Sequence, residues 1–528
     1  MSQTSSDFTH LIQEALLSLQ QERLSNAITM TQKAIDVAPD ISAGYLVLAN
    51  ILERAGRIFD AAKALDECRR AVPTDLTIYP PLIRLLKASN HHEEAKKIIR
   101  TALIISPGSP SLHVLAGSQE TQIKRVALLE PSDYRLWTHS ASIYATSLSD
   151  KMAIRCAQRA ILLSPEMPLS YTLIPPCADR LYDYVLALNT AKWCLQITPD
   201  SHEMALSAGF CLFPLGDPIR GFELLERREM RPNEPRRIGL PRVWNGKMPA
   251  PKTLLVCAEQ GIGDEYMFLT CLLDLQALTD KLIVECDARN ISLYSRSFPK
   301  ISFIPRTITR HSDNSLQWDY RPHPEVLAAE KYVLAGSLCG IFGVATTRPP
   351  QSFGYLKPSQ NEAKVWGNWL ASLGNLPKVG LCWRSGEPDP IRNTFYFSLD
   401  RVLQELGDAP VIYVSLLHVD PGTEILEALE KHEIKVYQPP NLDQRNELDR
   451  VAALLTCLDL VISCGNAVGS LAAACGVPTI KLDAPAFRNK GSGDPLYSHV
   501  HPCSEGQEPF DRDTLIRRAK TFMHELLF

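Results

Sequence analysis

Small and apolar side chains recur through the first two hundred residues at spacings of three, four and seven, which place them on one face of a helix. The first such set is Ala15, Leu16, Leu19, Leu24, Ala27, Ile28, Ala34 and Ile35. The next is Tyr45, Leu48, Ala49, Leu52, Gly56, Ala61, Ala62, Leu65 and Ala71. Alanine and glycine at these positions allow two helices to cross closely. The pattern therefore predicts successive pairs of short, packed helices.

A proline follows each predicted pair, at Pro39, Pro73, Pro107, Pro131, Pro165 and Pro199, in steps of 34, 34, 24, 34 and 34 residues. Proline cannot continue a helix, so each one marks the end of a second helix. A period of about 34 residues is typical of tetratricopeptide repeats (TPRs), whose stacked units form a concave groove that usually holds another protein. We therefore expect a TPR α-solenoid over residues 1–228, in which the short fourth unit has one helix clipped or replaced by a turn.

Residues 229–251 have a different character, with five prolines and several arginines. So many prolines exclude a helix interior. We expect a linker that lies against the following region, with Trp244 as its packing anchor.

From Lys252 onwards the pattern changes to short apolar runs that alternate with helical segments. The runs predict strands at Thr253–Ala258, Lys281–Cys286, Ile301–Ile304, Lys378–Trp383, Val411–Leu416, Lys435–Tyr437, Leu458–Ser463 and Thr479–Leu482. Helices are expected at Met267–Leu278 and Asp511–Phe528. Near-continuous β-branched runs with crossover helices indicate parallel sheets buried on both faces. The expected fold class is α + α/β, with two Rossmann-like halves, residues 252–365 and 366–528, that face a cleft.

Composition and charge argue against several classes of protein. A formal net charge of -4 argues against a general nucleic-acid binder. No apolar run of about 18 residues exists, so no membrane span is expected, and the start MSQTSSDFTH lacks a signal pattern, so we expect a cytoplasmic protein. The fourteen cysteines form neither a CxxC motif nor a zinc-site spacing, which favours buried thiols in a reducing compartment and predicts no metal site.

The first candidate motif follows a predicted buried strand and precedes a helix, in the loop Ala258–Glu265 (AEQGIGDE). Gly261 and Gly263 allow a tight turn that brings backbone N–H groups to a ligand. A purely structural strand-to-helix turn explains these glycines equally well. Asp264 lies in the first helical turn, where a carboxylate is favoured as a cap; its functional interpretation is a general base at the cleft.

The second motif, Gly380–Gly386 (GLCWRSG), ends the first strand of the second half. Ligands of open α/β sheets bind beyond the carboxyl ends of the strands. Arg384, with Ser385 beside it, could pair there with a phosphate in bidentate fashion; a surface arginine in a local salt bridge is the alternative. Arg392 and Tyr396 follow on a loop that could cover the ligand.

The third motif, Ser463–Ala472 (SCGNAVGSLA), follows the strand LDLVIS. Small residues at a strand end that open a helix form an anion site, and Asn466 and Ser470 can form hydrogen bonds with a ligand. Close packing of the helix on the sheet would also require small residues here.

Together these segments resemble a family of bacterial proteins in which TPRs precede a glycosyltransferase domain of the GT-B type, akin to the heptosyltransferases. The matching pieces are GDPIRGFELLERR (216–228), LPRVWNGK (240–247), LLVCAEQGIGDEYMF (254–268), GLCWRSG (380–386), DLVISCGNAVGSLAAACGVPT (459–479) and, more loosely, GDPLYSHVHP (493–502). They occur in the family's order and span nearly the whole chain. The WRSG loop followed by Arg392 and Tyr396 resembles the branch that includes flagellin glycosyltransferases.

The resemblance implies that Asp264 is the catalytic base. It implies that the donor is held by Gly261, Gly263, Arg384, Ser385, Asn466 and Ser470. In the family the last motif usually reads Asp-Thr-Ala, followed three residues later by His. Here Gly465, Asn466 and Ala467 stand in for the triplet and Ser470 replaces the His, so an acid and an imidazole are missing. Either the donor differs from heptose nucleotides or this site is impaired.

These expectations describe a metal-independent glycosyltransferase without a cofactor. It would move a sugar from a nucleotide-sugar to Ser or Thr of a protein acceptor recruited by the TPR groove. The resemblance implies nonulosonic acids activated as CMP sugars as donors and flagellin as an acceptor. The alternatives are a non-catalytic TPR adaptor with a degenerate transferase domain, a transferase that acts on lipid or polysaccharide, and a repeat chaperone without enzyme function.

Overall fold

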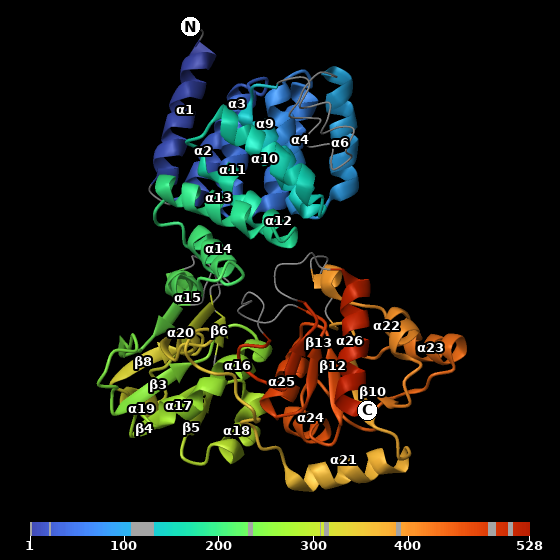
Figure 1. Cartoon of the computed structure of the whole chain (residues 1–528). Coiled ribbons are helices and arrows are strands. Elements are labelled where there is room, and N and C mark those ends of the chain that lie inside the picture. The colour runs from blue at the N-terminus through green and yellow to red at the C-terminus, as the bar shows by residue number, and fades with distance from the viewer. Residues whose placement is uncertain are drawn as a thin grey trace. The chain divides into compact units, whose positions relative to one another are not determined.

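The computed structural model describes residues 3–20, 23–106, 131–230, 236–306, 308–310, 316–386, 392–483, 493–504 and 511–528. The chain divides into two compact units, Met1–Cys177 and Ala178–Phe528, whose elements are labelled in Figure 1. The described part of the first unit is helical, and the second combines helices with parallel sheets. The α + α/β class is therefore confirmed, while the finer boundaries expected at 228, 251 and 365 stay predictions.

Eight described helices of the first unit pack in consecutive pairs: α1 (Gln3–Gln20) with α2 (Leu24–Val37), α3 (Ser42–Arg54) with α4 (Ile58–Ala71), α5 (Tyr79–Ala88) with α6 (His92–Ile105), and α9 (Tyr134–Thr146) with α10 (Asp150–Leu163). The short helix α11 (Pro168–Thr172) follows and packs against α9 and α10. The second helix of each pair ends two residues before a proline of the predicted ladder. The TPR-like helical repeats are thereby confirmed. Residues 107–130, which make up most of the expected short unit, lie outside the described residues.

In three of the repeats an aromatic side chain returns to the carbonyl of the proline six residues before it. The bonds run from Tyr79 Oη to Pro73 O (2.7 Å), from Trp137 Nε1 to Pro131 O (3.0 Å) and from Tyr171 Oη to Pro165 O (2.9 Å). Each bond spans the turn between the proline and the helix that opens the next unit, so it fixes the joint between consecutive repeats.

Replacing Tyr79 by phenylalanine removes one such bond and keeps the buried ring. We expect Tyr79→Phe to lower the free energy of unfolding by about 1 kcal/mol, the usual net contribution of a hydrogen bond. Urea unfolding of the full chain measures the effect. Tyr134→Phe is the matched control, because no hydrogen bond of its hydroxyl is found in the described part of the first unit. Equal losses in both variants would contradict a specific role for the Tyr79 bond.

The second unit begins with α13 (Tyr184–Ile197), α14 (His202–Leu212) and α15 (Pro218–Leu225) and then forms two lobes, each built on a parallel sheet. The N-lobe sheet has the order β2 (Arg242–Val243), β8 (Lys331–Leu334), β3 (Thr253–Cys257), β4 (Lys281–Cys286) and β5 (Ser302–Pro305). The C-lobe sheet has the order β11 (Val436–Tyr437), β10 (Ile412–Ser415), β9 (Lys378–Cys382), β12 (Leu460–Ser463), β13 (Thr479–Lys481) and β14 (Val500–Pro502).

The order of the C-lobe sheet is that of a doubly wound, Rossmann-type sheet. If β9 is counted as the first strand, the order in space reads 3-2-1-4-5-6. In the N-lobe, β5, β4, β3 and β8 lie in the equivalent order 3-2-1-4 if β3 is counted as the first strand. β2, which precedes β3 in the sequence, is added at the edge of the sheet beside β8. Sheets of this order bind ligands where the strand order reverses, beyond the carboxyl ends of the strands. These ends are therefore where a site is expected in each lobe.

The predicted strands are confirmed, but several other elements differ from expectation. In place of a helix at Met267–Leu278, α16 (Ile262–Phe268) begins earlier, and a 3₁₀ turn (Leu269–Cys271) separates it from α17 (Leu272–Gln276). The short strands β8 and β14 were not predicted. The segment 229–251 contributes β2 and also β1 (Arg236–Ile238), which forms a small sheet with β7 (Leu316–Asp319) and β6 (Ile308–Arg310). Trp244 is buried there, with Nε1 3.0 Å from Lys247 O.

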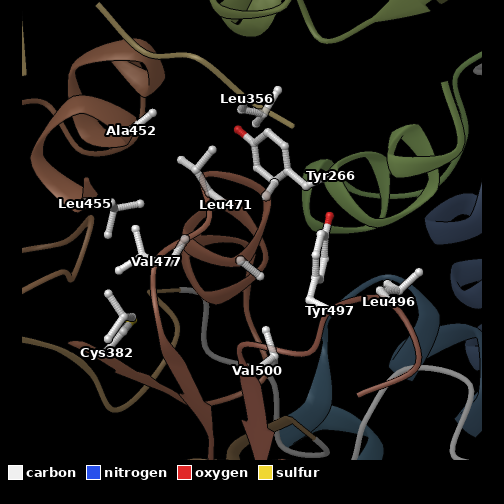
Figure 2. Close-up of a cluster of buried hydrophobic side chains, with 14 of the residues drawn as sticks. Tyr266, Leu356, Cys382, Ala452, Leu455, Leu471, Val477, Leu496, Tyr497 and Val500 are labelled. Atoms are coloured by element: carbon white, nitrogen blue, oxygen red, sulfur yellow. The ribbon is translucent and has the colours of Figure 1, made fainter. Parts of the chain in front are cut away.

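One continuous apolar core runs through both lobes. It contains Leu254 of β3 as well as Val379 of β9. Figure 2 shows part of it, including Tyr266 of α16 and Leu471 of α25 (Ala467–Ala474). Because strands of both sheets contribute to the same core, the two lobes share the apolar contacts that stabilise the second unit.

Polar contacts add to this junction between the lobes. Arg296, on α18 (Ile291–Ser297), donates from both terminal nitrogens to the two carboxylate oxygens of Asp449, on α24 (Leu448–Leu455), at 2.8 Å each. Arg289, which follows β4, donates from Nη1 to the carbonyl of Arg445, which follows β11, at 2.7 Å. Bidentate arginine–carboxylate pairs are geometrically specific, so the Arg296 contact fixes how the lobes meet.

Candidate functional site

A cavity of about 630 Å³ opens between the N-lobe and the C-lobe of the second unit. It gathers most of the residues that the sequence motifs indicated. Its lining includes Gly261, Gly263 and Asp264 from the N-lobe and Ser385, Tyr396, Asn466 and Ser470 from the C-lobe. The structure thus brings three separate motifs to one place, although the individual roles of these residues stay predictions.

The walls of the cavity come from loops at the carboxyl ends of parallel strands. β3 leads into Gly261–Asp264, β9 into Ser385 and β12 into Asn466. The starts of α16 and α25 meet here, since a methyl carbon on Gly263 would lie 3.2 Å from Ala467 Cα. A side chain at 263 would push the two helix starts apart, so the glycine serves close packing between the lobes.

Two arginines hold the backbone of the loop between β3 and α16. Arg237 Nη2 donates to Ala258 O at 2.6 Å, and Arg306 Nη1 donates to Gln260 O at 3.0 Å. Arg237 also lies 3.6 Å from the centroid of the Trp318 ring, a cation–π contact. Gln260 has a left-handed backbone, with φ of 57°, a conformation that costs energy outside glycine and persists where its surroundings fix it. The loop is therefore preorganised.

Glu259 of the same loop takes part in a buried ion-pair network. Its carboxylate accepts from Arg228 Nε at 3.1 and 2.8 Å, and its Oε1 also accepts from Gly336 N at 2.7 Å. Arg228 Nη2 donates in turn to Ser337 Oγ at 2.8 Å. Burial alone would lower the pKa of Arg228, but the carboxylates of Glu259 and Glu226 outweigh it and the pKa is raised. Glu259 thus fastens the segment after α15 to the loops that follow β3 and β8.

Asp264 caps a helix, as the sequence pattern favours, and it also lies in the cavity wall. Its Oδ2 accepts from Gly261 N at 3.0 Å, which caps the first turn of α16. The residue is also half-buried and lines the cavity. The cap orients the carboxylate at the cavity wall. Its role as a general base stays a prediction.

Arg384 forms the local salt bridge that was considered as an alternative to phosphate binding. Its Nε and Nη2 donate to Glu424 Oε1 at 2.8 and 2.5 Å, and Trp383 Nε1 donates to the other oxygen, Oε2, at 2.7 Å. Arg384 does not belong to the cavity lining found among the described residues. Its binding of a phosphate stays a prediction and would require it to leave Glu424. Arg392 begins a 3₁₀ turn at Arg392–Phe395, and its side chain lies outside the described part of the structure.

Asn466 is the N-cap of α25. Its Oδ1 accepts from Gly469 N at 3.3 Å and from Ser463 Oγ at 2.9 Å. Its Nδ2 donates to Cys382 Sγ at 2.7 Å and lies 3.4 Å from Cys464 Sγ. A hydrogen bond with Cys382 and burial both raise the pKa of the Cys464 thiol, so this thiol is protonated and weakly polar. The amide that could bind a ligand is therefore already engaged with the protein.

The cavity lining also contains polar and charged side chains that the motifs did not indicate: Arg289, His418, Gln444, Arg445, Lys481 and Asp483. His418 follows β10, and Lys481 and Asp483 lie at the end of β13. The rule that ligands lie beyond the carboxyl ends of strands, applied to every predicted strand and not only to the glycine-rich loops, would have indicated Arg289, His418 and Asp483, which each follow a predicted strand within three residues.

Lys481 is the most buried cation of this lining, with 7% of its surface exposed. Its Nζ lies 3.1 Å from Oδ2 of the buried Asp494. Burial alone would lower the pKa of Lys481, but Asp494 and Asp483 outweigh it and raise the pKa. The C-lobe wall therefore carries a charged ammonium group beside a carboxylate.

The described residues contain neither a metal-binding cluster nor a helix that could span a membrane. No group of three or more His, Cys, Asp or Glu side chains in these ranges could hold a metal ion. No described helix is both long and apolar enough to cross a bilayer.

The chain resembles a known bacterial protein along most of its length. It is 25% identical over 493 residues to Protein FlbA of Caulobacter vibrioides, in an alignment that covers 89% of this chain and 81% of that protein. No protein-family model matches the chain.

Solved structures with helical repeats are similar over less than half of the chain. PilF of Pseudomonas aeruginosa is 14% identical, with a TM-score of 0.32, and covers 44% of this chain and 95% of its own. A tetratricopeptide repeat protein of Parabacteroides merdae is 14% identical, with a TM-score of 0.34, and covers 43% and 93%. At TM-scores this low the likeness carries no argument about function.

Proposed function

We propose that this chain is a glycosyltransferase of the GT-B type that moves a sugar from a nucleotide-sugar to a serine or threonine of a protein held by its TPR-like repeats. The observation that carries the proposal is the cavity between two parallel sheets, one of them in Rossmann order, with Asp264 in its wall. Sheets of this order bind nucleotides at their carboxyl ends. The resemblance to TPR glycosyltransferases supplies the reaction, and a cytoplasmic location fits it.

The proposed reaction uses the residues of both lobes. The acceptor hydroxyl oxygen attacks the anomeric carbon of the sugar, and its proton passes to the Asp264 carboxylate. The bond between the anomeric carbon and the phosphate oxygen breaks, and the nucleotide leaves with the electron pair. Arg445 in the cavity lining offers positive charge to the departing phosphate. Arg289 and Lys481 also line the cavity, each paired with a carboxylate, Asp287 and Asp494, and can add hydrogen-bond donors. An acceptor held by the repeats would present its hydroxyl at a raised effective concentration.

A non-catalytic adaptor is the second candidate, and two observations favour it. Glu424 neutralises Arg384, which the resemblance implies for donor binding. Gly465 and Ser470 also replace the acid and the imidazole that the related motif carries. An adaptor would use its helical repeats alone, and its cavity would bind no nucleotide-sugar.

Two measurements test the proposal. Intact-mass analysis of proteins that co-purify with the chain, from cells with and without it, should show an acceptor that gains the mass of one or more sugars. Calorimetry with a panel of nucleotide-sugars should show binding heat for at least one of them. Absence of binding heat and of nucleotide release across the panel would overturn the enzyme and leave the adaptor. Sugar on a lipid or polysaccharide but on no protein would overturn the proposed acceptor.

A further inference from the structure

The side chain of Asp483 lies over the bare Cα of Gly465 in the cavity wall. A methyl carbon at position 465 would lie 2.6 Å from Asp483 Oδ2, 3.4 Å from its Cγ and 3.5 Å from its Cβ. Asp483 therefore occupies the space that a side chain at 465 would take. Both residues belong to the cavity lining, one after β12 and the other after β13.

Lys481 helps to fix this arrangement. Lys481 is the last residue of β13, Asp483 follows two residues later, and both line the cavity. The two groups are close enough for the Asp483 carboxylate to help raise the pKa of Lys481. The ammonium group of Lys481 is tied to Asp494, whose Oδ1 is held in turn by the N–H groups of Leu496 and Tyr497 at 2.9 and 3.1 Å. The cation beside Asp483 therefore has a fixed position, and the wall offers one fixed ammonium group and one carboxylate to a ligand.

This arrangement changes what the start of α25 can bind. A carboxylate that lies on Gly465, directly before the N-cap Asn466, repels a phosphate from that position. An ionised carboxylate has only acceptor atoms, and hydroxyl groups are the uncharged donors with which a nucleotide-sugar is rich. The acid that is missing from position 465 of the chain is thus present in space, supplied by the neighbouring strand.

We propose that Asp483 is a donor-binding residue whose carboxylate accepts a hydrogen bond from a hydroxyl group of the nucleotide-sugar, on its sugar or on its ribose. The assignment rests on the proposed function, because it requires a nucleotide-sugar in this cavity. Gly465 is glycine so that Asp483 can reach the wall. Substrate contact at this point therefore depends on two residues that are 18 positions apart in the sequence.

Calorimetry of the full chain tests the assignment with four probes: CMP-N-acetylneuraminic acid, UDP-N-acetylglucosamine, CMP and UDP. For the probes that the unaltered chain binds, Asp483→Ala should weaken binding by roughly 10- to 100-fold, the range expected for a hydrogen bond to a charged group. Loss with the sugar nucleotides alone places the hydroxyl on the sugar, and equal loss with CMP or UDP places it on the ribose. Glu430→Gln, at an exposed acid of the C-lobe, is the control and should change nothing.

A rescue variant separates ligand binding from a structural role. The double variant Gly465→Asp with Asp483→Gly returns the carboxylate to the same wall from the other strand and should recover most of the lost affinity. Asp483→Asn keeps the shape of the side chain and should weaken binding less than Asp483→Ala, which keeps the test decisive if the alanine variant unfolds. Unchanged binding by both Asp483→Ala and Asp483→Asn would overturn the assignment of Asp483 and would not affect the proposed glycosyltransferase function. If the unaltered chain binds none of the four probes, the assignment of Asp483 is overturned. The proposed glycosyltransferase is overturned as well only if the chain binds no member of the wider panel of nucleotide-sugars.

Discussion

Replacing Asp264 by asparagine is expected to slow the proposed sugar transfer by about 100- to 10,000-fold, the range typical of a lost general base. An amide cannot take the proton from the acceptor hydroxyl. It can still accept a hydrogen bond from Gly261 N, which the carboxylate does at 3.0 Å, so α16 should keep its cap. The variant should therefore fold and bind its ligands while losing the reaction.

Initial rates of nucleotide release, with the acceptor found by the mass comparison, measure this effect. Asp280→Asn, at an exposed acid of the N-lobe, is the matched control and should keep its full rate. Donor affinity should change little in both variants. Transfer at the full rate by Asp264→Asn would remove Asp264 from the mechanism and leave its cap as its contribution.

The second large effect concerns stability, and Glu259→Gln should lower the free energy of unfolding by about 3–5 kcal/mol. The substitution leaves the buried guanidinium of Arg228 without its main counter-charge, and breaking a buried pair on one side costs that much. Domains of ordinary stability have only about 5–15 kcal/mol in total. The chain should therefore become marginally stable without any change in the cavity lining.

The same arginine provides the control. Glu226 also contacts Arg228, at 3.1 Å, but its side chain is 56% exposed, so Glu226→Gln should cost less than about 1 kcal/mol. Urea unfolding followed through buried tryptophans measures both losses, and the transition of the Ala178–Phe528 unit must be the one that shifts. Equal losses in the two variants would show that burial of the pair does not decide its contribution.

The repeats and the strands could be predicted because each follows from local chemistry. A proline ends a helix wherever it stands, and a run such as Leu460–Ser463 is buried on both faces in any parallel sheet. The short strands were missed because their pairing does not follow from local chemistry. β14 contains a histidine and a proline, and its three residues pair only because β13 lies beside them.

The sequence predicted those parts of the candidate site that lie in glycine-rich loops. The motifs led to Gly261, Asp264 and Asn466, which meet in one cavity. Sequence alone could not show that Glu424 holds Arg384 or that Asp483 covers Gly465, because these contacts join residues distant in the chain. Such contacts depend on the packing of neighbouring strands and helices, which no local pattern encodes.

The continuous core that runs through both sheets has a kinetic consequence. Parting the lobes would hydrate aromatic rings such as Tyr266 and Tyr497, each of which withdraws about 150–250 Å² from water. It would also break the bidentate contact between Arg296 and Asp449. Separation of the two lobes therefore has a large free-energy cost. We expect substrates and products to exchange through the mouth of the cavity, with turnover governed by local breathing of its rim and little affected by the swing of whole lobes.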